Sequence, residues 1–431
     1  MNAIPKTMFS DPAPVPSPVL RNYPAGVCLL NRNVFHIDRT VSLAPSDVEN
    51  WLLDQANKVA DTTAMIEGFG ARLVQAGLGV ARLGLNVGTL HPQALGYAWN
   101  WNILDGFCDE IMLNEGVLSM EAYRSSPLYR TMEFGAQVQI SLESDGAGRE
   151  GALMTELAEA GFTEYLAVPL PTRKTRSNAV TLATLQPGGF TDLQKHTLHR
   201  LLKIFALHVE RHVAERITEN ISRAYLGREA AQRVVSGTIK RGGGRPIRAI
   251  VWSSDMRGFS GLSETMDNQI TAQMLDRYFS VMADAVIKHG GDVIKFIGDG
   301  MLAVFLLEDF DTPEMAAKAA ATSAREAVAL LDALNLEMQD DPDWAHLQTG
   351  IGLHLGEVFF GNIGSAKRLD FTVIGEAVNI ASRIEGFCKP MNRNILMSAP
   401  VASLLHESFE DMGTQRLNGI SRTENLFALR E

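Results

Sequence analysis

The stretch GGDVIKFIGDGMLAVF, residues 290–305, constrains the fold of this chain more than any other. Two apolar runs flank a Gly-Asp-Gly tripeptide, a pattern typical of a tight hairpin turn. A hairpin that packs on both faces has little room for charge, yet Lys295 lies in the first run and Asp299 at the turn. The pattern therefore predicts a hairpin that presents a cation and a carboxylate for a function.

The residues around this hairpin alternate between strand-like and helical patterns. The segment KRGGGRPIRAI, residues 240–250, is typical of a linker. After it, we expect strands at 247–253, 293–305, 347–364, 369–375, 392–398 and 424–430, and helices at 263–289, 313–336 and 376–387. Strands that alternate with long helices predict an α/β (α+β) unit over residues 240–431, with helices packed on the sheet.

Residues 45–190 predict a second α/β unit. A helical pattern between Pro45 and Gly77 precedes short strand-like runs, an order typical of small-molecule sensor domains. Upstream, the proline-rich residues 1–44 predict a flexible arm.

Residues 191–239 predict a connecting and dimerisation helix followed by a transducer segment. Its apolar residues begin with heptad spacing and then drift: Leu198, Leu202, Phe205, Val209, Val213, Ile217 and Ile221. A parallel dimer contact is the favoured interpretation, and an amphipathic helix packed on its own domain is the alternative.

Composition excludes several classes of protein. The net charge of -11 and the absence of a basic block argue against a nucleic-acid partner. No apolar run approaches the ~18 residues of a membrane span, and the N-terminus lacks the layout of a secretory signal. Three scattered cysteines, Cys28, Cys108 and Cys388, favour a reducing compartment, so we expect a cytoplasmic protein.

Asp255 is the carboxylate that pairs best with Asp299. It follows the apolar strand at 247–253 and precedes a glycine-containing loop, which is typical of a corner that binds phosphate and Mg²⁺. If this strand lies beside the hairpin, the two acids face each other and repel unless a cation lies between them. The pair predicts a two-metal site, and two unrelated turn acids are the alternative.

Asn379 and Arg383 add a second group of candidate residues. They lie four residues apart and so share one face of the helix expected at 376–387. Together they can hold a ribose and a charged phosphate, because the planar guanidinium matches phosphate oxygens.

These motifs together resemble the class III nucleotidyl cyclases. Four segments carry the resemblance in the order of the family: VWSSDMRGFSGLSE, GGDVIKFIGDGMLAVF, GIGLHLGEVFFGNIGS and DFTVIGEAVNIASRIE. They cover about residues 247–430, so the resemblance implies a ferredoxin-like class III catalytic domain at 240–431.

The resemblance implies specific roles at the metal and phosphate end of the site. Asp255, Asp299 and the backbone carbonyl of Met256 would bind two Mg²⁺ or Mn²⁺ ions per site. The loop amides would meet the β- and γ-phosphates of the nucleotide, at Gly258, Phe259 and Ser260.

At the nucleoside end, the resemblance assigns Lys295 and Thr372 to the adenine base, Asn379 to the ribose and Arg383 to the transition state. Thr372 stands where many members have Asp, as in a subgroup of bacterial soluble adenylate cyclases. The Thr hydroxyl still accepts a hydrogen bond from the adenine amino group.

The C-terminal segment departs from the family. Relatives often carry a Lys before a Gly there that contacts the triphosphate, whereas this chain has Asn418 before Gly419. Arg416 and Arg422 are the candidate replacements.

The resemblance implies an adenylate cyclase that converts ATP to 3′,5′-cyclic AMP and pyrophosphate by in-line attack of the ribose 3′-hydroxyl on the α-phosphate. The sites would be shared across a homodimer, with the metal residues from one chain and the base, ribose and transition-state residues from the other. A guanylate cyclase and a catalytically silent nucleotide-binding regulator are the alternatives. A diguanylate cyclase is disfavoured, because Val293 and Ile294 stand where that family needs an acid and a Phe.

The N-terminal unit resembles GAF-type sensor domains through GFTEYLAVPLP, TLATLQPGGFTDLQ and the long exit helix. This implies regulation by a small-molecule ligand. Trp99, Trp101, His91 and Cys108 are candidates for its pocket, although core residues are the favoured interpretation.

Overall fold

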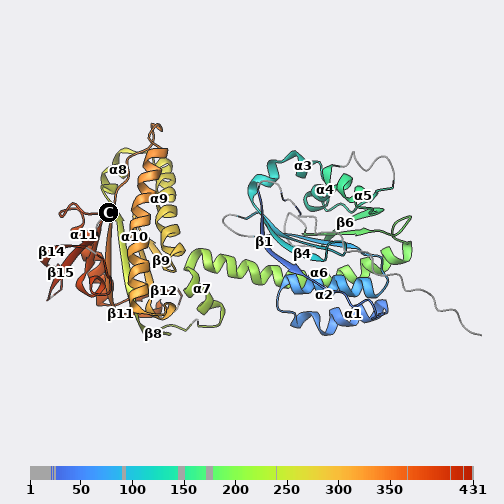
Figure 1. The fold of residues 1–431 in the computed structure, drawn as a ribbon, viewed down its shortest axis with the longest axis horizontal. Coiled ribbons are helices and arrows are strands. Elements are labelled where there is room, and N and C mark those ends of the chain that lie inside the picture. Colours follow the sequence, from blue (N-terminus) through green and yellow to red (C-terminus); the bar gives the residue numbers. More distant parts are fainter. Residues whose placement is uncertain are drawn as a thin grey trace, which may run out of the picture. The chain divides into compact units, whose positions relative to one another are not determined.

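The computed structural model describes residues 21, 23, 26–89, 94–143, 151–170, 178–238, 240–365, 367–407, 409–420 and 422–429. The chain forms two compact units, Met1–Ile221 and Ser222–Glu431 (Figure 1). Within the described residues, every helix is too short or too polar to cross a membrane.

The N-terminal unit is built on a seven-stranded antiparallel sheet with the strand order β1-β4-β3-β2-β7-β6-β5. The strands are β1 (Val27–Val34), β2 (Arg82–Gly88), β3 (Gly96–Asn102), β4 (Phe107–Leu113), β5 (Val138–Ser141), β6 (Glu164–Leu170) and β7 (Asn178–Thr184). The helices are α1 (Pro45–Asp54), α2 (Thr62–Gln75), α3 (Glu121–Arg124), α4 (Pro127–Phe134) and α5 (Ala152–Glu159). Helices α1, α2 and the start of α6 (Asp192–Leu226) cover one face, and α3–α5 lie at the other (Figure 1).

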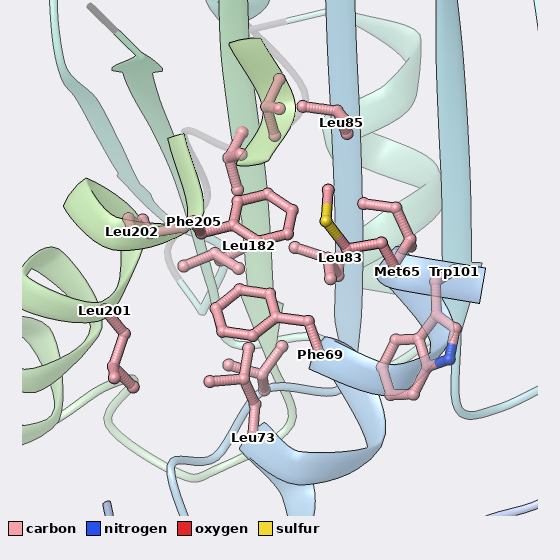
Figure 2. Close-up of a cluster of buried hydrophobic side chains, with 14 of the residues drawn as sticks. Met65, Phe69, Leu73, Leu83, Leu85, Trp101, Leu182, Leu201, Leu202 and Phe205 are labelled. Atoms are coloured by element: carbon pink, nitrogen blue, oxygen red, sulfur yellow. The ribbon is translucent and has the colours of Figure 1, made fainter. Parts of the chain in front are cut away.

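The main core of this unit lies between the sheet and helices α2 and α6. Figure 2 shows Phe69 of α2 beside Phe205 of α6, with ring centroids 4.4 Å apart. Trp99, Trp101 and Cys108 are fully buried in this core, which confirms the core interpretation of these residues. His91 lies outside the described residues.

Two expectations for the N-terminal half need correction. Val27–Val34 form the edge strand β1, paired with β4, within the segment predicted to be a flexible arm; residues 1–20, 22, 24 and 25 lie outside the described residues. Four positions of the predicted dimer seam pack into the unit's own core: Leu198, Leu202, Phe205 and Val209. This part of α6 therefore follows the alternative interpretation, because its apolar stripe is already covered.

The C-terminal unit is a mixed sheet with the order β14-β15-β13-β11-β8-β10-β9, and β12 pairs with β11. Its strands are β8 (Gly244–Met256), β9 (Asp292–Ile297), β10 (Gly300–Leu306), β11 (Thr349–Gly364), β12 (Leu369–Ile374), β13 (Ile395–Ser398), β14 (Phe409–Arg416) and β15 (Thr423–Leu429). The four strands β11-β8-β10-β9 are joined as β8-α9-β9-β10-α10-β11, which is the ferredoxin-like βαββαβ arrangement. The expected α/β fold class is confirmed.

Helices cover both faces of this sheet. Helices α9 (Asn268–Lys288) and α10 (Pro313–Glu337) pack side by side over one core (Figure 1). Helices α7 (Arg228–Val235) and α11 (Glu376–Phe387) contribute to the core at the other face. The helix expected at 263–289 is in fact two helices, α8 (Phe259–Thr265) and α9. The side chain of Asp267 caps α9 by accepting from the backbone N–H of Gln269, which makes the break.

Glycines of β11 position α11 close to the sheet. A Cβ on Gly352 would meet the carbonyl oxygen of Ala381 and the backbone N of Glu385, and one on Gly356 would lie 2.5 Å from the Cβ of Ala377. Only glycine allows this approach. The helix predicted to carry Asn379 and Arg383 is thus fixed against the strand that neighbours β8.

Candidate functional site

Asp255 and Asp299 are brought together by strand pairing. Asp255 lies at the end of β8, and Asp299 lies in the turn between β9 and β10. The register aligns Met301 of β10 with Ser254 of β8, so the hairpin turn falls beside Asp255. The predicted adjacency of strand and hairpin is therefore present, and both side chains are partly exposed.

The electrostatics of this pair are those of two carboxylates that repel. Burial, followed by the negative charge and hydrogen bonding of Asp299, raises the pKa of Asp255 to about 6. Glu385 of α11 lies close enough for the negative charges of Asp255 and Asp299 to act on its carboxyl group. Its own burial and the charge of Asp255 raise the pKa of Glu385 to about 7.

The pair fits a divalent cation. Excess negative charge between two carboxylates is what a bound cation neutralises, and Mg²⁺ commonly takes one or two carboxylates and completes its shell with phosphate oxygens and water. A closed all-protein metal cage is not formed, since the described residues contain no group of three or more His, Cys, Asp or Glu side chains placed around one point. The arrangement fits an open site completed by a ligand.

The loop after Asp255 turns directly into a helix. Met256 is the last residue of β8, and its neighbour Arg257 donates from Nη2 to the carbonyl oxygen of Arg393, 2.5 Å away. Gly258 adopts φ +77°, a left-handed conformation that favours glycine, and α8 begins at Phe259. Ser260 is exposed.

Lys295 forms an ion pair with a residue that sequence reasoning missed. Its Nζ lies 2.5 Å from Oδ2 of Asp370 on β12. Asp370 and Thr372 are two residues apart on this strand and so point to one side. The hairpin that carries Asp299 and the strand that carries Thr372 therefore meet at Lys295. The two-residue spacing of Asp370 and Thr372 already indicated in the sequence that both side chains point to one side of their strand.

Asn379 and Arg383 are exposed on α11. The helix buries its other face, through Ala377, Ile380, Ala381 and Ile384. Within the part of the chain that the structure describes, neither Asn379 nor Arg383 makes a side-chain hydrogen bond or ion pair. Both side chains are therefore available to a ligand.

Asp292 is a second residue that sequence reasoning missed. It is buried at the start of β9, where its two carboxylate oxygens accept the backbone N–H groups of Arg228 and Glu229, each at 3.1 Å. Gly227, with φ +81°, precedes them, and a Cβ there would lie 2.6 Å from the carbonyl oxygen of Val293. Asp292 thus caps α7 and attaches the end of the transducer segment to the strand that carries Lys295.

Arg416 and Arg422, the candidates to replace the lysine that contacts the triphosphate in relatives, differ in whether they already have a partner. Arg422 donates from Nε to Glu424 at 2.7 Å. Arg416, the last residue of β14, is exposed, as is Asn418.

Comparison with known proteins bears on the C-terminal unit as a whole. Residues 248–429 match the family model described as the adenylate and guanylate cyclase catalytic domain. The C-terminal unit therefore contains a nucleotidyl cyclase catalytic domain.

Among curated relatives, an adenylate cyclase of Anabaena cylindrica is 37% identical over 176 residues, which are 40% of this chain and 34% of that protein. Adenylate cyclase 1 of Rhizobium meliloti is 28% identical over 225 residues, 52% of this chain and 31% of that protein. The chain thus spans about a third of the length of these relatives.

Two solved structures are also similar. The adenylyl cyclase CyaB from P. aeruginosa matches with 26% identity and a TM-score of 0.41, over 44% of this chain and 96% of that one. The guanylyl cyclase Cya2 matches with 28% identity and a TM-score of 0.38, over 43% of this chain and 92% of that one.

Proposed function

We propose that the chain is an adenylate cyclase that converts ATP to 3′,5′-cyclic AMP and pyrophosphate. The observation that carries the proposal is the facing pair Asp255 and Asp299 on a cyclase catalytic domain, with Lys295 on the same hairpin. Retention of both acids argues against a silent nucleotide-binding regulator, which would have no need of a repelling pair.

The metal end would be formed by Asp255, Asp299 and the backbone carbonyl of Met256. When bound, two Mg²⁺ or Mn²⁺ ions would acidify the ribose 3′-hydroxyl and neutralise the triphosphate. The β- and γ-phosphates would be held for in-line displacement by the backbone N–H groups of Gly258, Phe259 and Ser260. No side chain of the described site is assigned as a general base.

The nucleoside end would be read by Lys295 and Thr372, with Asn379 orienting the ribose. Lys295 donates three N–H bonds and accepts none, which suits the ring nitrogen of adenine, and the Thr372 hydroxyl accepts from its amino group. Arg383 would stabilise the charge that develops on the α-phosphate, because its planar fork matches phosphate oxygens. Guanine remains the nearest alternative base.

We propose a homodimer in which each site takes its metal residues from one chain and Asn379 and Arg383 from the other. Large apolar side chains are exposed on the strands that flank the Lys295–Asp370 pair: Phe296 (49%), Ile297 (60%) and Ile374 (50%). Apolar side chains of this size on neighbouring strands are typical of a protein interface.

The N-terminal unit is proposed to be a GAF-like sensor, residues 45–190, that regulates the catalytic domain at 240–431 through the segment 191–239. The Asp292 cap supports this route, since it ties α7 to β9. A cytoplasmic location is part of the same proposal, because ATP is the substrate.

Formation of cyclic nucleotide tests the activity. Purified full-length protein would be offered ATP or GTP with Mg²⁺ or Mn²⁺, beside Asp299→Ala and, as a matched control, Asp311→Ala at an exposed acid of the same unit. We expect cyclic AMP from ATP that is lost only in Asp299→Ala. Product from GTP alone would replace the proposal with a guanylate cyclase, and no product under any condition would favour the silent regulator.

Mixing inactive variants tests the shared site. Asp299→Ala and Arg383→Ala each break both sites of their own homodimer, whereas the mixed dimer keeps one intact site. Equal mixing with subunit exchange should therefore restore about a quarter of wild-type activity. No recovery despite subunit exchange would contradict a shared site.

A further inference from the structure

A buried chain of two hydroxyl groups ends at the backbone of Asp255. The hydroxyl of Tyr278 on α9 lies 2.8 Å from Oγ1 of Thr349, the first residue of β11. Thr349 Oγ1 in turn lies 3.2 Å from the carbonyl oxygen of Asp255 and 3.4 Å from that of Gly350. Tyr278 and Thr349 are buried, with 0% and 2% of their surfaces exposed. The chain therefore runs from helix α9 through β11 to the end of β8.

The direction of the hydrogen bonds follows from the chemistry of each atom. A carbonyl oxygen only accepts, so Thr349 donates its single hydroxyl proton to a carbonyl, and that of Asp255 is the nearer one. Tyr278 then donates to Thr349 Oγ1. Burial raises the pKa of Tyr278, so the phenol keeps the proton that it donates. The chain thus delivers one directed hydrogen bond to the Asp255 carbonyl.

The peptide between Asp255 and Met256 lies where the strand pairing of β8 becomes one-sided. The ladder between β8 and β10 ends at the pair Ser254 and Met301, whereas the ladder with β11 continues to Met256. Beyond Ser254, β8 therefore has a partner among the described strands only on the β11 side. The Thr349 hydroxyl adds a hydrogen bond on that side, at the carbonyl of this same peptide.

The two groups proposed for the metal are attached at the ends of this peptide. The backbone N–H of Arg257 donates to the carbonyl oxygen of Gln348, 2.8 Å away, so Arg257 faces β11. Backbone groups alternate in direction along an antiparallel strand, so the carbonyl of Met256 faces the other side, that of β10 and its turn. The Asp255 carboxylate lies at that turn too, since a Cβ on Gly300 would be 3.1 Å from its Oδ1. A looser peptide would leave both groups less well fixed.

We infer that Tyr278 and Thr349 are positioning residues for the metal end of the site, which hold Asp255 and Met256 in the orientation that a divalent cation requires. Neither hydroxyl is assigned a contact with the cation or the nucleotide, because Tyr278 belongs to the core under α9 and α10. Residues that orient metal ligands commonly change metal affinity 10–100-fold. The inference rests on the proposed metal site at Asp255 and Asp299.

Thermal unfolding of the full chain in rising Mg²⁺ at constant ionic strength tests the inference without an activity readout. Tyr278→Phe and Thr349→Val each remove one hydroxyl and nearly keep the shape of the side chain. We expect each to raise the Mg²⁺ concentration for half of the maximal Tm increase by about tenfold. Thr271→Val is the matched control, since it removes a buried hydroxyl of α9 that bonds the Asp267 carbonyl at 2.9 Å. Whatever its own Tm, this control should keep the wild-type half-saturation.

A double variant tests whether the two hydroxyls act as one chain. If Tyr278 acts through Thr349, the variant with both substitutions should need no more Mg²⁺ than Thr349→Val alone. Thr349→Ser keeps the hydroxyl, so it should respond like the wild type, and it replaces Thr349→Val as the test of this position if that variant does not fold. Effects of the two substitutions that multiply in the double variant would overturn the chain.

Failure of the inference differs from failure of the metal site. A saturable Mg²⁺ response that Asp299→Asn loses, but that Tyr278→Phe and Thr349→Val keep at the wild-type half-saturation, overturns the inference and leaves the site intact. A wild type that responds to Mg²⁺ no more than Asp299→Asn does overturns both.

Discussion

The repulsion between Asp255 and Asp299 predicts that removing one acid stabilises the metal-free protein. The pKa of Asp255 is raised from 3.8 to about 6 by its burial and by Asp299. A group with a raised folded pKa adds stability that is complete below its unfolded pKa and is lost as the pH rises through its folded pKa. The wild type should therefore lose stability between about pH 4 and pH 7, in the window set by these two values.

The full rise in the pKa of Asp255 corresponds to a free energy of about 3 kcal/mol. Asp255 is partly exposed and solvent screens the interaction, so we reduce this to about 1–1.5 kcal/mol. Asp299→Asn removes the share due to Asp299, about 1 kcal/mol, while the burial of Asp255 remains. For a unit of this size, 1 kcal/mol corresponds to a Tm difference of about 2–4 °C.

Thermal unfolding in EDTA at pH 4 and pH 7 measures this difference. We expect wild type and Asp299→Asn to melt together at pH 4 and the variant to melt higher at pH 7. Adding Mg²⁺ at pH 7 should raise the wild type alone, because a cation between two carboxylates removes their repulsion. Equal Tm differences at both pH values, or a Tm difference that Mg²⁺ leaves unchanged, would refute the reasoning.

Three further predictions concern residues around the site. Asp292→Ala should destabilise the C-terminal unit by about 1–2 kcal/mol in urea unfolding, because two helix N–H groups lose their acceptor; unchanged stability would contradict the cap. Asp370→Ala should raise the KM for ATP about tenfold with little change in kcat by freeing Lys295, and Asp370→Glu should restore it; equal loss in both variants would contradict an orienting role. Burial, with Arg422 nearby, lowers the pKa of His354 to about 4. The stability that neutral His354 provides is therefore lost as the pH falls from 6.5 to about 4, and His354→Gln should flatten this acid limb of a Tm profile.

The sequence predicted those parts of the fold that rest on local pattern. The hairpin and the strand that ends at Asp255 were recognised by apolar runs and a glycine turn, and their adjacency was the condition on which the two-acid site depended; the structure has them paired. Strand β14, residues Phe409–Arg416, was missed because its sequence FEDMGTQR is mostly polar; it lies at the sheet edge, where one side faces solvent. Strand β1 was missed although its sequence VCLLNRNV begins with an apolar run, because it follows the proline-rich segment that predicted a flexible arm.

Tertiary contacts decided what local pattern could not. The seam of α6 looked like a dimer contact because spacing alone does not say which surface an apolar stripe covers, and the partner of Phe205 is Phe69, far away in sequence. Likewise, the counter-ion of Lys295 is Asp370, which becomes its neighbour only when β12 folds beside β9. The spacing of Asp370 and Thr372 indicates that they share one side of β12, but the strand that faces them is set by the fold as a whole.

The charge of Lys295 inside an apolar hairpin now has a physical explanation. Strand β9 ends the strand order of its sheet, so among the described strands only one side of it has a backbone partner, and its residues Phe296 and Ile297 are exposed. An exposed apolar edge invites unwanted pairing unless charge or a second surface covers it. In one chain, Asp370 balances Lys295 but leaves the apolar side chains in water. A second catalytic domain laid over this edge would bury them and bring its own Asp255 and Asp299 toward Lys295, so the same surface that is unfavourable in a monomer is what a shared site requires.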